Sequence, residues 1–198
     1  MPNGTPLSQT YQLKDAMARV LSRLGITDAD SNMKPKIINE SNAQQKIIAK
    51  KLRETDPAVK VGYEETATVV FVSGEVTFVT VEVSNPIIVE PVRLEATNAD
   101  TTSYGTIPFI DDTAFNNLRG FSYFDNSLLH TIVGRRLKLF SGQNVSTAGM
   151  TFKLIYIREV NTLVNDADYV DLPNSTFDEL INSVVPMFEK KVEEEVKA

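Results

Sequence analysis

The stretch TATVVFVSGEVTFVTVEV, residues 66–83, decides the fold class of this 198-residue chain. It is rich in valine, threonine and phenylalanine, which favour β-strands, and it lacks the three- and four-residue apolar spacing of a helix. Ser73 and Gly74 divide it, and such a pair between two strand-like runs is typical of a tight hairpin turn. The stretch therefore predicts antiparallel strands at 66–72 and 75–83.

The second of these strands has an irregular pattern. Val76 and Phe78 alternate with polar neighbours, but the apolar phase slips by one residue between Phe78 and Val79. The slip indicates a β-bulge or burial of both faces. Because a two-stranded hairpin is marginal alone, we expect hairpin 66–83 to be covered by another chain, with sheet packing inside its own chain as the alternative.

Two helical patterns precede the hairpin. Residues 8–24 carry apolar residues at helical spacing, with Ser8 as candidate N-cap and Gly25 just beyond the end. The second pattern covers 37–54, with Pro35 in its first turn and Asp56-Pro57 beyond its end. These two segments predict an antiparallel helix pair.

After the hairpin, further strands are predicted at 87–94, 137–140 and 151–158. They extend the β-rich region to 66–158, with an exposed polar loop at 97–106. Residues 107–134 contain many aromatic side chains without a clear period, and no element is predicted there.

The last predicted element is an amphipathic helix over 174–194. Pro173 precedes it, Thr176 and Glu179 have the spacing of a capping box, and Pro186 should kink its axis. Its apolar stripe must be covered, so we expect it to pack on the two N-terminal helices. The residues expected to be buried are Phe177, Leu180, Ile181, Val184 and Phe188.

The order of elements predicts an α+β fold, because strands and helices do not alternate as they do in a doubly wound sheet. We expect a single domain, 1–198, in which the N-terminal helix pair and the C-terminal helix pack together beside an antiparallel β-rich middle. The composition, 42% apolar and 23% charged, suits such a domain. The absence of cysteine excludes a disulfide framework, a thiolate metal site and a cysteine nucleophile.

Charge is distributed unevenly. The net charge is −6, yet residues 1–60 hold 10 Lys and Arg against 6 Asp and Glu. Seven basic residues lie within 34–60: Lys34, Lys36, Lys46, Lys50, Lys51, Arg53 and Lys60. A helix would place Lys46, Lys50 and Arg53 on one face, which suits phosphate contact, although a solvated helix face is the usual explanation of such a pattern. No apolar stretch is long and uncharged enough for a membrane helix, and the N-terminus does not resemble a cleaved leader, so no membrane contact is expected.

Candidate catalytic residues form no recognisable set. His130 is the only histidine and lacks a nucleophile motif, so a structural or surface role is expected. The neighbouring carboxylates Glu64-Glu65 and Asp111-Asp112 do not suit glycosidase chemistry, because neighbours on a strand point to opposite faces. Residues 28–32 begin like a calcium loop but lack its glycine and final glutamate. The sequence predicts no enzyme, no catalytic, cofactor-binding or metal-binding residue, and no cofactor; an enzyme would need His130 or these carboxylates to converge in a cleft.

Three stretches together resemble a known family: IINESNAQQKII at 37–48, LKLFSGQNVSTAGMTFKLIYIREV at 137–160, and DYVDLPNSTFDELINSVVPMFEKKVEE at 168–194. They are similar to the ring, adaptor or head–tail connector proteins of tailed bacteriophages, including the ring proteins of crAss-like phages. The motifs that carry the resemblance are Asn42-Ala43-Gln44-Gln45, Tyr156-Ile157-Arg158 and Asp171-Leu172-Pro173, in that order. Pro186 and the valine-rich hairpin depart from the family pattern.

The resemblance implies a non-enzymatic virion structural protein, made in the host cytoplasm and assembled as a homo-oligomeric, dodecameric ring in the connector or tail. Its expected partners are further copies of itself, the portal, neighbouring ring or tail proteins, and DNA passing through a channel. The alternative function is a nucleic-acid-contacting protein that uses the basic helix face at 34–60.

Overall fold

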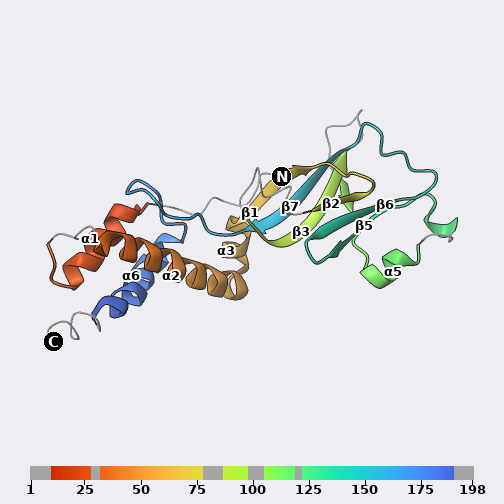
Figure 1. Cartoon of the computed structure of the whole chain (residues 1–198). Coiled ribbons are helices and arrows are strands. Elements are labelled where there is room, and N and C mark those ends of the chain that lie inside the picture. Colours follow the sequence, from red (N-terminus) through yellow and green to blue (C-terminus); the bar gives the residue numbers. More distant parts are fainter. Residues whose placement is uncertain (1–9, 28–31, 78–86, 98–104, 119–121, 190–198) are drawn as a thin grey trace. The chain divides into compact units, whose positions relative to one another are not determined.

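The computed structural model describes residues 10–27, 32–77, 87–97, 105–118 and 122–189. They form two compact units, a helical unit from residues 10–63 and 160–189 and a β unit from residues 64–159 (Figure 1). The α+β class and the predicted order of helices, antiparallel strands and helix are confirmed. A single domain would require the two units to unfold together, which the arrangement of their contacts does not test. The single domain 1–198 therefore stays a prediction.

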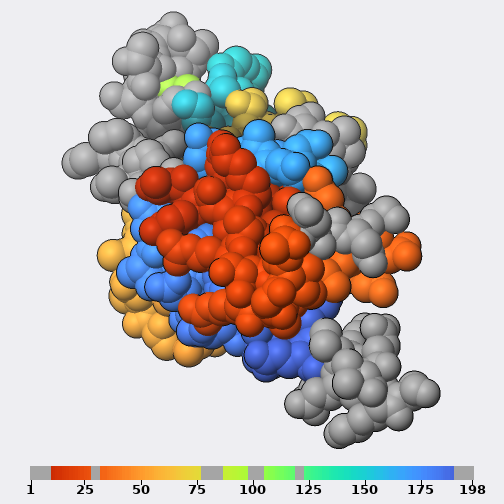
Figure 2. Space-filling view, turned by 90° about the vertical axis from the view of Figure 1, so that its left-hand side faces the viewer, coloured from red at the N-terminus to blue at the C-terminus, as the bar shows by residue number. Residues whose placement is uncertain are grey.

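The helical unit contains α1 (Leu13–Arg23), α2 (Met33–Thr55), α3 (Pro57–Gly62), the 3-10 turn η2 (Asn174–Thr176) and α6 (Phe177–Val184). The predicted packing of the C-terminal helix on both N-terminal helices is confirmed, since α6 contacts α1 and α2. In Figure 2, α1 lies in front in red, with blue residues of the C-terminal segment beside it. All five residues expected to be buried on the C-terminal helix are buried: Phe177, Leu180, Ile181, Val184 and Phe188.

The ends of α1 follow partly from the sequence. Gly25 has φ +71° and lies just beyond the helix, as predicted. The Ile26 N–H donates to the Leu21 carbonyl at 3.0 Å, which completes a Schellman motif and satisfies an otherwise open helix carbonyl. The start differs: α1 begins after Gln12, whose N–H donates to the Asp15 carboxylate at 2.8 Å. The predicted cap, Ser8, lies outside the described residues.

The two proline-bearing segments of the helical unit had different outcomes. Pro35 lies in the first turn of α2, as expected, but Asp56-Pro57 begins a further short helix, α3. The Asp56 carboxylate caps α3 by accepting from the Ala58 N–H at 2.9 Å, so the pair starts a helix where the sequence indicated only an end. This short helix was not predicted.

The capping box predicted for the last helix is wrong. The Thr176 hydroxyl donates to the Pro173 carbonyl at 2.8 Å instead of capping α6, which begins at Phe177. Regular helix ends at Val184, and a separate helical turn follows at 186–189, consistent with interruption by Pro186. Residues 190–194 of the predicted helix lie outside the described residues.

The β unit contains two antiparallel sheets. The larger has the order β1 (Glu64–Val69), β7 (Thr151–Arg158), β3 (Ile88–Thr97) and β4 (Gly105–Ile107), and the smaller has β2 (Glu75–Thr77), β6 (Arg136–Ser141) and β5 (Leu128–Val133). The short helix α5 (Asp112–Asn116) and the 3-10 turn η1 (Ser122–Phe124) complete it. Fully buried Leu94, Leu137, Leu154 and Tyr156 lie at its core.

The predicted hairpin is a corner between these sheets. Ser73 and Gly74 form the tight turn, with φ +53° and +82°, and Val72 and Glu75 exchange both backbone hydrogen bonds. The strands on either side do not form a two-stranded hairpin, however, because β1 pairs with β7 and β2 pairs with β6. Sheet pairing within the chain therefore accounts for the described part of 66–83, and the phase slip at 78–79 lies outside it.

Other strands match the sequence unevenly. The predictions at 137–140 and 151–158 are confirmed by β6 and β7. The predicted loop 97–106 is wrong at both ends, because Thr97 belongs to β3 and Gly105 and Thr106 belong to β4. Strand β5 was not predicted in the aromatic-rich stretch 107–134, because its burial does not alternate.

Candidate functional site

Residues from two of the three motifs that carry the family resemblance take part in a hydrogen-bonded network in the helical unit. The Asn42 amide donates to the Leu163 carbonyl at 2.9 Å and accepts from the Leu163 N–H at 2.8 Å. One helix turn later, Gln45 donates to the Asn161 carbonyl at 2.9 Å and accepts from the Asp171 N–H at 2.8 Å. Two side chains of α2 thus bind the backbone of the segment between β7 and η2.

Asp171 closes this network from the opposite side. Its carboxylate accepts from the Asn161 N–H at 2.9 Å, and its carbonyl accepts from the Tyr63 hydroxyl at 2.6 Å. Gln45, Tyr63 and Asp171 are each fully buried. Unpaired buried polar groups are costly, so these residues fix the path of the chain and are not exposed to bind a ligand.

The remaining motif, Tyr156-Ile157-Arg158, lies in β7 of the β unit. All three residues are buried, and the Arg158 Nε lies 3.3 Å from the Glu65 carboxylate. Each motif therefore contributes buried residues to the unit in which it lies, which sequence spacing alone did not reveal.

The basic residues at 34–60 do not form one free surface. The Lys34 Nζ lies 2.9 Å from the Asp166 carboxylate, and the Lys51 Nζ lies 3.3 Å from the Glu179 carboxylate. Arg53 lies over the Tyr63 ring, with 5.3 Å between the guanidinium carbon and the ring centroid. Lys36, Lys46 and Lys50 remain exposed on α2.

These contacts also explain the uneven charge along the sequence. The basic N-terminal segment and acidic C-terminal residues pack in the same unit, where the Arg19 Nη1 lies 2.6 Å from the Asp178 carboxylate. Arg19 also lies over the stacked rings of Tyr11 and Phe177. Part of the charge asymmetry along the sequence is thus neutralised by ion pairs within the helical unit. It therefore does not by itself give the molecule a basic face and an acidic face.

His130 is buried in β5, as a structural histidine would be. It is 3% exposed, and its ring meets the edge of Phe109 with 5.6 Å between centroids. Burial lowers the pKa of His130 below 6.5, while the carbonyls of Pro108 and Ile107 act in the opposite direction. No carboxylate is among the causes of this shift, so His130 lacks the acidic partner that orients a catalytic histidine in a triad.

Glu64 and Glu65 on β1 pair with different residues, as the strand argument predicts, whereas Asp111 and Asp112 lie at the start of α5. Glu64 Oε2 lies 3.9 Å from the Arg93 Nη1, whereas Glu65 pairs with Arg158. Asp111 caps α5 by accepting from the Ala114 N–H at 3.0 Å. The described residues bring no three acidic or histidine side chains together as a metal-binding group, and the calcium-like residues 28–31 lie outside the described ranges.

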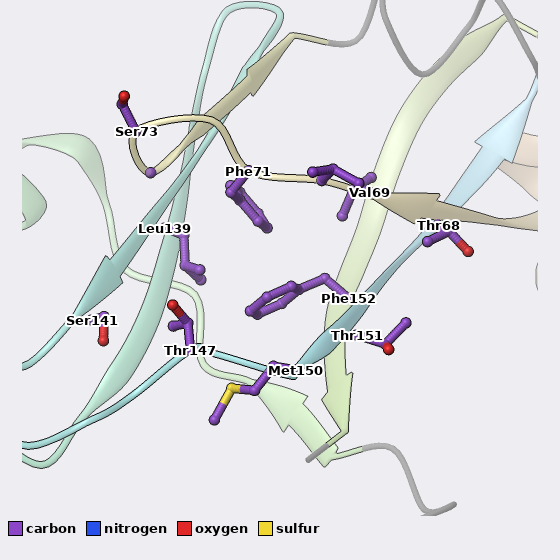
Figure 3. Close-up of a pocket in the computed structure, with 12 residues that line it drawn as sticks. Thr68, Val69, Phe71, Ser73, Leu139, Ser141, Thr147, Met150, Thr151 and Phe152 are labelled. Carbon is purple, nitrogen blue, oxygen red and sulfur yellow. The ribbon is translucent and has the colours of Figure 1, made fainter. Parts of the chain in front are cut away.

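A pocket of about 650 Å³ opens in the β unit beside the Ser73-Gly74 turn (Figure 3). Its apolar wall consists of Val69, Phe71, Leu139, Met150 and Phe152, together with the exposed Val70. Hydroxyl groups surround this wall, from Thr68, Ser73, Ser141, Thr147 and Thr151. None of the described lining residues is charged, so the pocket suits a neutral group with an apolar body and a polar tip.

The centre of the pocket is aromatic. Figure 3 shows Phe71 and Phe152 pointing toward one another from different segments, and their centroids lie 5.1 Å apart in an edge-to-face arrangement. The Ser141 hydroxyl donates to the Val145 carbonyl at 2.6 Å, whereas the half-buried Thr147 hydroxyl has no hydrogen-bond partner among the described residues. Thr147 is therefore available for an incoming polar group.

Comparison with known proteins gives no assignment. No family model matches the chain, and no curated protein matches it. In the described part of the chain, no helix has the length and apolar character needed to cross a membrane.

Proposed function

We propose that this chain is a virion structural protein, a subunit of a dodecameric ring in the head–tail connector or tail of a tailed bacteriophage. The observation that carries the proposal is the Asn42, Gln45 and Asp171 network. Gln45 and Asp171, which were chosen only for their family resemblance and lie far apart in the sequence, meet through a buried hydrogen bond, and Asn42 binds Leu163 in the same segment as Asp171. A chance resemblance would not be expected to select residues that determine one local architecture.

The proposed partners are other copies of the chain, the portal and neighbouring ring or tail proteins in the virion. The exposed apolar residues support contacts of this kind. Val70 and Val72 are each 72% exposed at the corner between the sheets, where a neighbouring chain would remove them from water. We therefore still propose that another chain covers the segment 66–83, at the corner between the two sheets.

Electron cryomicroscopy of particles that contain the chain tests this proposal, with native mass spectrometry of the purified full chain beside it. We expect a closed ring with twelve copies in the particle. Isolated monomers in the particle, or an open filament, would contradict the proposed ring. A monomer in solution alone would not, because neighbouring virion proteins can enforce closure.

A second candidate function, contact with nucleic acid, is favoured only by Lys36, Lys46 and Lys50 on the exposed side of α2. If these residues bind phosphates, K46E/K50E should weaken DNA binding and reduce the slope of log affinity against log salt by about 2. Lys14→Glu, a charge reversal at an exposed residue of α1, is the control. An unchanged slope would show that these lysines do not contact DNA phosphates, either in a free complex or in a ring channel.

A further inference from the structure

We propose that the uncharged pocket of the β unit binds Tyr123 of a second copy of this chain. This inference rests on the proposed ring, since it names the contact that would join neighbouring copies. Its physical basis is a match between two separate features of one unit: a pocket for a neutral aromatic group and an exposed tyrosine.

Tyr123 is the most exposed large apolar residue that the structure describes, at 86%. Its turn is held firmly, because the Ser127 N–H donates to the Phe124 carbonyl at 2.9 Å and the Asn144 N–H donates to the Asp125 carbonyl at 2.8 Å. Gly142 packs so closely that a Cβ there would clash with the Phe124 and Asp125 carbonyls. The ring of Phe124 supports Tyr123 edge-on at 5.2 Å.

The pocket has the chemistry that a tyrosine requires. Phe71, Met150 and Phe152 provide an apolar and aromatic surface for the ring, and offset or edge contacts between such groups are favourable. The Thr147 hydroxyl can donate to or accept from the phenol hydroxyl. An ion or a phosphate would find no charged lining residue, which favours an aromatic side chain over these ligands.

A second copy is the occupant that fits the proposed assembly. Tyr123 stays exposed in its own chain, so the pocket of the same copy does not hold it. A contact between one patch and a different patch is heterologous, and repeated heterologous contacts form a ring when the rotation between copies closes. Tyrosines at protein interfaces often contribute a large share of the binding energy.

A photo-crosslinking amino acid placed at position 123 of the full chain tests the contact directly. Crosslinking is performed at high concentration in a mixture of ¹⁴N- and ¹⁵N-labelled chains, which separates crosslinks between copies from those within one copy. We expect mixed-label crosslinks from position 123 to the peptides that contain Phe71 or Thr147. Crosslinks only within one copy, to other surfaces, or none at all would overturn the inference.

Variants measure the energetic part of the same contact by sedimentation equilibrium. Tyr123→Ala should raise the dissociation constant for self-association by about tenfold or more, whereas Tyr123→Phe and Thr147→Val should each raise it about two- to tenfold. If the two hydroxyls bond to each other, the dissociation constant of the Y123F/T147V double variant should be no higher than that of either single variant. Tyr169→Ala, at a half-exposed tyrosine of the helical unit, is the matched control.

The outcomes separate this inference from the proposed function. Rings of normal copy number formed by Tyr123→Ala with unchanged self-association would reject the tyrosine contact and leave the ring intact. Particles in which the wild-type chain forms no ring would reject the proposed function itself. Crosslinks from 123 to a different virion protein would replace the second copy as the occupant and contradict the contact proposed here.

Discussion

The two units differ in how they use polar and apolar groups. In the helical unit, Asn42, Gln45 and Asp171 are paired through the buried network, with the Ser41 hydroxyl as a buried exception that has no partner among the described residues. In the described β unit, His130 Nδ1 and the Thr131 hydroxyl are buried without a hydrogen-bond partner, and Tyr123 is held in water. In the proposed ring, the helical unit would be the scaffold of each subunit and the β unit would supply the contacts between copies.

The largest expected effect comes from emptying a core position in each unit. Leu180→Ala in α6 and Leu137→Ala in β6 remove side chains that are both fully buried, and each should cost about 2–5 kcal/mol of unfolding free energy. Hydrogen exchange under increasing denaturant measures the loss unit by unit. If the chain is one cooperative domain, either change destabilises both units equally; a loss below about 0.5 kcal/mol for Leu180→Ala would show that α6 is peripheral.

Gln45→Ala should have a slightly smaller effect, about 2–4 kcal/mol, because it leaves the Asp171 N–H and the Asn161 carbonyl without their partner. Gln44→Ala is the control, since Gln44 donates only to Glu40 on the same helix and should change stability by less than about 0.5 kcal/mol. Urea unfolding measures both losses of stability. Equal losses for the two substitutions would show that the network does not stabilise the helical unit.

Gly74→Ala tests how tightly the backbone packs at the corner of the β unit. Alanine at φ +82° is strained, and its Cβ would lie 3.2 Å from the Leu139 carbonyl oxygen, so we expect a loss of about 1–2 kcal/mol. Gly25→Ala has a similar φ of +71° in open space and should cost about 1 kcal/mol. The difference between their unfolding midpoints isolates the close approach at the corner; if Gly25→Ala is the more costly, that approach is unimportant.

The smallest effect is the pH dependence of His130. Its pKa in the folded chain lies below 6.5, so the unfolded chain binds protons more readily, and stability should fall as the pH drops below about 6.5 toward the folded pKa. His130→Gln should flatten stability over this range, as followed by thermal unfolding from pH 7 to pH 5. A wild-type profile that rises on acidification would contradict the lowered pKa. His130→Ala should leave assembly intact wherever folding is preserved.

Local signals in the sequence predicted local structure well. The positive φ of Gly25, the tight turn at Ser73-Gly74 and the strand at 151–158 depend on the conformational preferences of neighbouring residues. The opposite directions of Glu64 and Glu65, toward Arg93 and Arg158, follow from the two-residue period of a strand.

Long-range partners were not predictable in the same way. Gln45 meets Asp171 across most of the chain, and no local pattern encodes that pairing. The corner between sheets was missed because β1 and β2 have the composition of a hairpin, while their partners β7 and β6 lie far along the sequence. The pocket beside this corner likewise gathers residues from four separate segments, none of which is distinctive alone.

The helical unit is assembled from both ends of the chain, and the β unit is inserted between them. The insert begins and ends on neighbouring strands, with Glu64 paired opposite Ile157, so its two connections emerge side by side. Because the β unit precedes α6 in the sequence, folding of the β unit during synthesis would shorten the loop that the helical unit must close. The neighbouring ends allow the insert to be replaced by a short linker between residues 63 and 160, and the folding of that shortened chain would show whether 1–198 is one domain or two.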